Sequence, residues 1–104
     1  ALDARRVPLD TVRYGIGAPD TVNVAVYVTE LKICPEGANC FLPDGIDIAE
    51  TPDADEEASR LVFVEAPRQF AVGRRYLMSL AVTPPSNPRR AENALDLLAY
   101  SRLE

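Results

Sequence analysis

The clearest alternation of apolar and polar positions runs from Val22 to Val28, where valines occupy every second position. Asn23, Ala25 and Tyr27 stand between them, so one face of an extended segment is apolar and the other is mixed. β-Branched and aromatic residues predominate, and these favour strands over helices. We therefore expect a long strand from Val22 to Ile33, around which the rest of the chain packs.

Four further segments have the length and composition of strands. The first follows a Pro43-Asp44-Gly45 turn signal, and another is a short, nearly continuous apolar run that suits a strand buried on both faces. The expected strands are Ile46–Glu50, Leu61–Glu65, Arg74–Thr83 and Ala94–Ser101. Alternation within these strands and the first predicts a core that contains Val24, Val26, Leu61, Phe63, Leu80 and Val82.

The segment from Arg89 to Arg102 is ambiguous, because its apolar positions fit a helical face and also a strand face. On the strand reading, Leu95, Leu97 and Ala99 share one face. We favour the strand, since a closing strand covers a sheet edge that otherwise stays exposed.

Five strands without a convincing helix between them predict an all-β domain. A long first strand suits a small five-stranded antiparallel barrel of the OB type, partly open, and an immunoglobulin-like β-sandwich is the alternative. At 104 residues, we expect a single core built from residues 21–102. Residues 1–20 are expected to form a lead-in arm with one short strand near Thr11–Tyr14, before glycines and a proline interrupt the pattern.

The two ends of the chain lead to expectations about processing. Ala1 is not preceded by methionine, which is compatible with a signal peptide or lipid anchor upstream. Leu103-Glu104 matches the dipeptide that a common cloning site leaves before a purification tag, so residues 103–104 are read as a vector remnant.

The chain has two cysteines, Cys34 and Cys40, which enclose the turn-forming residues PEGAN. This placement predicts a local disulfide, which stabilises the fold by about 2.4 kcal/mol on the loop-entropy estimate. Two free thiols are the alternative, and a redox-active pair fits poorly because the spacer is longer than two residues. Since disulfides concentrate in small exported domains, we expect a periplasmic, extracellular or lipid-anchored location.

Charge is unevenly distributed along the chain. The net charge is −5, and residues 33–59 hold eight acids and no base. Nucleic acid is therefore an unfavourable partner, because phosphate binding needs a basic surface. At 47% hydrophobic and 26% charged residues, the composition is globular, and no apolar run is long enough to span a membrane as a helix.

The absence of histidine removes the usual general base, so neither a Ser-His-Asp nor a Cys-His site can form. A zinc site would need more cysteines. Asp53, Asp55 and Glu57 have the spacing of a calcium loop, but Ala58 and Val64 stand where that loop needs glycine and glutamate. We expect no catalytic activity, no cofactor and no metal site.

The function expected from these features is binding, with another protein or a cell-envelope component as the partner. The alternative is an OB-like binder of single-stranded nucleic acid or oligosaccharide. Stacking platforms and phosphate contacts for that alternative would come from one face of the barrel. The candidates are Tyr27, Tyr76 and Phe63 for stacking, and Arg74, Arg75, Arg89 and Arg90 for phosphates.

Overall fold

The computed structural model describes residues 4–12, 20–40, 43–55, 57–85 and 92–103. In these described residues, short 3-10 turns precede β1 and β4, and the other regular elements are strands. The elements are η1 (Leu9–Val12), β1 (Asp20–Lys32), β2 (Gly45–Ala49), β3 (Arg60–Phe63), η2 (Pro67–Gln69), β4 (Arg75–Thr83) and β5 (Ala94–Arg102). The all-β prediction is confirmed, and the C-terminal segment is a strand and not a helix.

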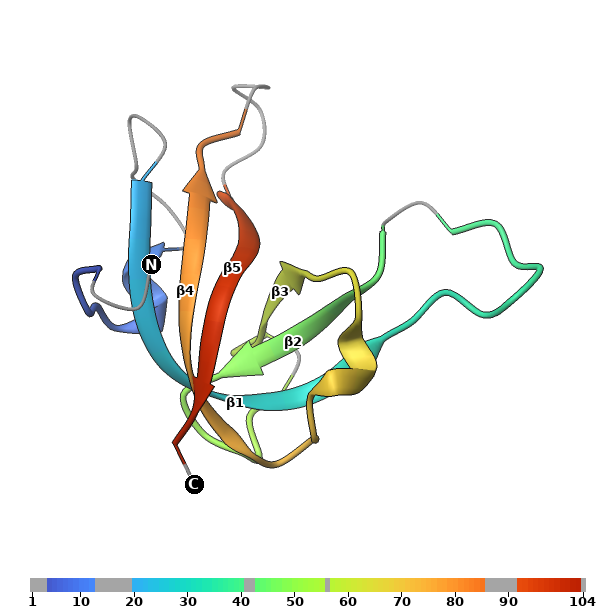
Figure 1. Ribbon diagram of the computed structural model, residues 1–104, viewed down its shortest axis with the longest axis horizontal. Helices are drawn as coiled ribbons and strands as arrows, with labels where there is room; N and C mark the ends of the chain where they lie inside the picture. Colours follow the sequence, from blue (N-terminus) through green and yellow to red (C-terminus); the bar gives the residue numbers. More distant parts are fainter. Residues whose placement is uncertain (1–3, 13–19, 41–42, 56, 86–91, 104) are drawn as a thin grey trace.

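The strands form one mixed sheet that closes in a ring in the order β1-β2-β3-β5-β4, which Figure 1 shows from the side. β1 is long enough to serve two neighbours, because Asp20–Tyr27 pairs with β4 and Tyr27–Lys32 pairs with β2. The strands therefore do not form the two facing sheets of a sandwich.

The expectation that all strands are antiparallel is wrong for β3 and β5, which run parallel and are paired at Phe63 and Asp96. The other neighbouring strands are antiparallel. Geometry requires such an exception, because strand direction cannot alternate all the way round a closed ring with an odd number of members.

The core lies inside the ring. Val24, Val26, Leu80 and Val82 are fully buried, as the alternation predicted. Leu61 and Phe63, which the same reasoning placed in the core, are only half-buried. Val62 and Val64 are buried in their place, at 0% and 8% exposed, together with Val22, Val28, Ile46, Ile48 and Met78. The register of β3 is therefore one residue out of phase with the prediction, since successive side chains of a strand point to opposite faces.

Irregularities in two long strands also change which residues face inward. In β1 the register shifts between Val28 and Glu30, so that Val28 pairs with Ile48 and Leu31 pairs with Ile46. In β5 the shift falls at Leu98, because Leu80 pairs with Leu97 while Ser79 pairs with Ala99. Leu98 is 51% exposed at this irregularity, and Tyr100, which is 37% exposed, pairs with the buried Met78.

The N-terminal residues pack against β1 and the core. Arg6 forms a parallel bridge with Asn23, where Val7 N donates to Asn23 O over 2.8 Å. Leu9 and Val12 of η1 are buried in the core. The short strand expected near Thr11–Tyr14 is therefore a 3-10 turn up to Val12, and Arg13 and Tyr14 lie outside the described residues.

Candidate functional site

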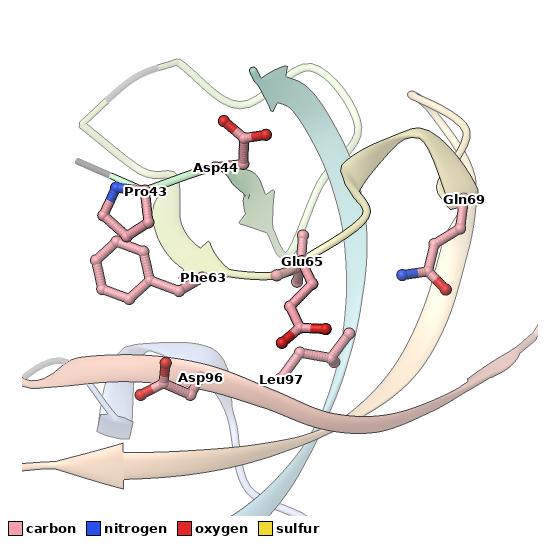
Figure 2. A pocket seen from close by; sticks show the side chains of 8 residues that line it. Pro43, Asp44, Phe63, Glu65, Gln69, Asp96 and Leu97 are labelled. Carbon is pink, nitrogen blue, oxygen red and sulfur yellow. The ribbon is translucent and has the colours of Figure 1, made fainter. Parts of the chain in front are cut away.

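A groove runs along the junction of β3 and β5, and we call it the seam groove. Its volume is about 720 Å³, and its walls come from four separate segments of the chain. These are Pro43–Asp44 before β2, residues 63–65 at the end of β3, Gln69 of η2, and Asp96–Leu97 of β5 (Figure 2). The groove exists because β3 leaves the sheet after Phe63 and continues into η2, while β5 runs on.

The floor and one rim of the seam groove are apolar. Val64 is 8% exposed, and Leu97 packs against the core. Phe63 is half-buried on the outer face of β3, and Figure 2 shows Pro43 beside its ring. These side chains place apolar surface along the seam, as is typical of ligand pockets.

The remaining lining residues are mainly carboxylates. Glu65 and Asp96 are exposed, and Asp44 is half-buried. Figure 2 shows the Glu65 side chain extending toward Leu97 on β5, and Asp96 lying on the same side of β5 as Phe63. The described residues that line the groove include no lysine or arginine, so all of its charged lining residues are acidic.

The disulfide predicted between Cys34 and Cys40 is confirmed, with a Cα–Cα distance of 6.0 Å. It closes the connection from β1 to β2 next to the seam groove. Cys34 N donates to Asp44 Oδ1 over 2.9 Å, and Val64 N donates to Asp44 O over 3.2 Å. Asp44 therefore ties the disulfide loop to the end of β3. A disulfide of this kind is typical of extracytoplasmic proteins.

An aromatic cluster supports the wall that η2 contributes. Phe70 lies 5.2 Å from Tyr76 and 4.6 Å from Tyr100 between ring centroids. The Tyr100 hydroxyl donates to Gln69 Oε1 over 2.8 Å, and Ala71 N donates to the Tyr76 hydroxyl over 3.0 Å. These contacts fix η2 with respect to β5 on the far side of the groove.

The residues predicted from sequence to form a ligand face are only partly brought together. Tyr27 and Arg75 pair across β1 and β4, with the Arg75 Cζ atom 6.0 Å from the Tyr27 ring centroid. Tyr76 is 4% exposed and faces the interior, while Arg74 is exposed in the turn before β4. Arg89 and Arg90 lie outside the described residues.

Arg75 also contributes to a second, smaller hollow of about 360 Å³ between the N-terminal segment and β1. Arg6 and Glu50 line this hollow as well. Glu50 Oε1 accepts a hydrogen bond from Leu9 N over 2.8 Å, so this carboxylate holds η1 in place. The hollow therefore combines opposite charges, whereas the charged residues that line the seam groove are all acidic.

The acidic connection between β2 and β3 forms a turn around Asp55. Ala58 N donates to Asp55 Oδ1 over 3.0 Å, and Ser59 N donates to Asp55 O over 3.1 Å. Within the described residues, no group of three or more acidic or cysteine side chains is arranged to hold a metal ion. Nor does the described part of the chain include a helix long and apolar enough to cross a membrane.

Sequence reasoning missed the seam groove as a site. Its residues are far apart in the chain, and the signal that could have pointed to it was the short run around Phe63, whose outward face was assigned to the core. No family model, curated protein or solved structure compared with this chain matches it. The fold and the groove therefore define it as an all-β, disulfide-bonded ring domain with an acidic surface groove.

Proposed function

We propose that the protein is a non-catalytic binding module of the cell exterior, and that it recognises a segment of another protein in the seam groove. The proposal is supported above all by one observation, the combination of an apolar floor with three carboxylates in a single groove. Binding grooves typically join hydrophobic contact area with a few polar groups that orient the ligand.

The fold assignment that accompanies this proposal is an OB-type barrel. The strand order β1-β2-β3-β5-β4 and the sharing of β1 between two neighbours support it. OB-type barrels bind their ligands over β2 and β3 and at the adjoining loops. Phe63 on β3 and Asp44 at the end of the β1–β2 connection lie in that region.

The cysteines support the compartment that we propose. The Cys34–Cys40 disulfide persists in oxidising surroundings and is rare in the cytosol of most organisms. We therefore propose a periplasmic, extracellular or surface-anchored location, where a small domain would meet other envelope proteins.

The charges of the seam groove favour a protein over a nucleic acid. Asp44, Glu65 and Asp96 would repel phosphate groups, whereas nucleic-acid binding surfaces gain affinity by neutralising phosphates with basic residues. Among the described residues, the Tyr27–Arg75 pair favours a nucleic-acid ligand, but it lies at the junction of β1 with β4, outside the lining of the seam groove.

An oligosaccharide is the second candidate ligand. The half-exposed ring of Phe63 stands beside carboxylates and the Gln69 amide, which can accept hydrogen bonds from sugar hydroxyls. A sugar ring packed on Phe63 would use this arrangement without requiring a charged ligand.

The test compares the two ligand classes on the same groove. Random peptides displayed on phage are selected against the folded protein, and a glycan array is probed in parallel. The variant Glu65→Arg places a long basic side chain in the seam groove, and Glu57→Arg makes the same change at an exposed acid outside its lining.

Selected peptides should bind the wild type and Glu57→Arg equally, and bind Glu65→Arg at least tenfold more weakly. Glycan binding that Glu65→Arg abolishes, without peptide selection, would replace the proposal with the oligosaccharide alternative. Peptide binding that both variants retain would show that the seam groove is not the site.

A further inference from the structure

The strand β5 has one edge that its neighbours leave largely uncovered. Its other edge pairs with β4 along the whole strand, from Ala94 to Arg102. On the seam side, the described part of the chain offers it a strand partner only at Asp96. β5 lines the seam groove at Asp96 and Leu97 and runs on from there, and no second strand of the described residues pairs with its seam side beyond Asp96. The main chain of such an edge strand readily pairs with another chain.

We propose that the partner segment binds as an added β-strand on this edge of β5, and that it carries basic side chains. The inference rests on the proposed function, since it specifies how the seam groove recognises a protein. The added strand takes the place that β3 vacates when it ends at Phe63 and turns into η2.

The dimensions of the edge suit a strand. Five residues of β5 span about 17 Å, which matches the length of an ordinary strand. Asp96 marks the end at which β3 takes over the pairing, and the Tyr100–Gln69 hydrogen bond holds η2 at the opposite end. The uncovered edge therefore lies between Asp96 and Tyr100, where Gln69 of η2 meets β5.

The side chains that line the groove determine which residue types fit in the added strand. Alternate residues of a bound strand point to opposite faces, so one set would meet the apolar floor at Val64 and Leu97. The other set would meet the carboxylates of Glu65 and Asp96. Arg68 of η2 and Arg102 of β5 are exposed and do not line the groove. Lysine or arginine is therefore the complementary residue at alternate positions of the partner.

The probe is a capped peptide of alternating residues, Val-Lys-Val-Lys-Val-Lys-Val, titrated into the ¹⁵N-labelled protein and followed by NMR. Two controls keep its length: the same peptide with glutamate for lysine, and versions with N-methyl groups on alternate residues along either edge. We expect amide shifts concentrated at residues 97–101 and Glu65. We also expect at least tenfold weaker binding of the glutamate peptide and loss of binding when one edge is N-methylated.

Variants of the protein test the charge contacts. Glu65→Gln and Asp96→Asn should each weaken the lysine peptide about two- to fivefold, the range measured for exposed ion pairs. Glu57→Gln, a change of the same kind outside the groove lining, should leave its affinity unchanged. The double variant Glu65→Lys/Asp96→Lys should come to prefer the glutamate peptide.

Three results would overturn the inference: equal binding of the two peptides, indifference to N-methylation on both edges, or shifts that centre away from β5. Concentration-dependent self-association with shifts at residues 97–101 would instead identify a second copy of this chain as the occupant. If phage-selected peptides depend on Glu65 while this peptide series fails, protein recognition in the groove stands and strand addition by a basic segment falls.

Discussion

The junction between β1 and β4 is built very differently from the junction between β3 and β5. β4 pairs with β1 through eight consecutive residue pairs, from Asp20 with Val82 to Tyr27 with Arg75. β3 meets β5 through the single pair of Phe63 and Asp96. The first junction is antiparallel and unbroken, whereas the second is parallel and opens into the seam groove.

This difference separates the junction that holds the fold from the junction that leaves surface open in the proposed binding groove. The β1–β4 junction encloses alternating valines and the β4 side chains Met78, Leu80 and Val82, all of them fully buried or nearly so. The β3–β5 junction contributes little pairing and leaves main chain and carboxylates facing outward. Binding surfaces are commonly drawn from such weakly paired regions, carried by a stable scaffold.

The largest expected effect is a difference in stability between substitutions at two adjacent residues of β3. Val62→Asp should abolish cooperative folding or remove more than about 4 kcal/mol, because it buries a charge without a partner at a fully buried position. Phe63→Asp should remain folded and lose about 1–2 kcal/mol, because Phe63 is half-buried on the outer face. Urea denaturation followed by circular dichroism measures both.

Val26→Asp, in the regular β1–β4 junction, is the positive control and should unfold the protein as Val62→Asp does. If Phe63→Asp unfolds the protein while Val62→Asp folds, the register of β3 is the one that alternation predicted and the outer face of the groove is misplaced.

The same contrast explains which parts of the fold the sequence could predict. All five strands were expected within a few residues of their bounds, because long alternating segments such as Val22–Val28 and Tyr76–Val82 identify both the strand and its inward face. In the short run Leu61–Val64 every residue is apolar, so alternation carries no information about the face. The register of β3 therefore depended on its pairing with β2, where Val62 lies opposite Ile46.

The candidate site could not be predicted from local sequence patterns. The seam groove joins residues from four segments, and the parallel pairing that creates it follows from closing a ring of five strands. The shift at Leu98 was equally hidden, because Leu95, Leu97 and Ala99 fit an uninterrupted strand. The disulfide, by contrast, was predictable because its two cysteines flank a local turn.

Removing the disulfide is a second way to compare the β1–β4 junction with the β3–β5 junction. Replacing Cys34 and Cys40 with serine should lower the free energy of unfolding by about 2.4 kcal/mol, because the loop regains freedom in the unfolded state. Urea denaturation measures the loss, and thiol titration of the denatured, unreduced wild type should find no free thiol.

The change should also loosen the seam groove selectively, since Cys34 N holds the Asp44 carboxylate. Hydrogen exchange should quicken at Val64, whose amide donates to Asp44 O, and stay slow in β1 and β4. Equal acceleration in both junctions would show that the loop supports the whole ring and not the groove in particular.

A glycine at the start of β2 gives a third, somewhat smaller effect. A Cβ atom on Gly45 would lie 2.5 Å from Val62 O and 3.0 Å from Leu61 Cδ1, so β2 and β3 must move apart to accept it. We expect Gly45→Ala to lower the free energy of unfolding by about 2 kcal/mol, as overpacking does.

Gly37→Ala is the matched control, because a Cβ atom there meets no heavy atom within 4 Å. Gly37 has a φ of +80°, so that change should cost only about 1 kcal/mol of backbone strain. A Gly45→Ala variant as stable as the wild type would mean that β2 and β3 are less tightly joined than the β2–β3 register implies.

The smallest expected effect tests the hydrogen bond that fixes η2 against β5. Tyr100→Phe removes the hydroxyl that donates to Gln69 Oε1 over 2.8 Å, while its ring can keep the contact with Phe70. A double-mutant cycle with Gln69→Ala should give a coupling energy of about 0.5–1 kcal/mol, the usual net value of a neutral hydrogen bond. Because Tyr100 is 37% exposed, water can satisfy the partners left behind, and each single variant should lose little more than the coupling itself. A coupling energy of zero would mean that η2 is held by the aromatic cluster alone, and that the wall of the seam groove is free to move without breaking this bond.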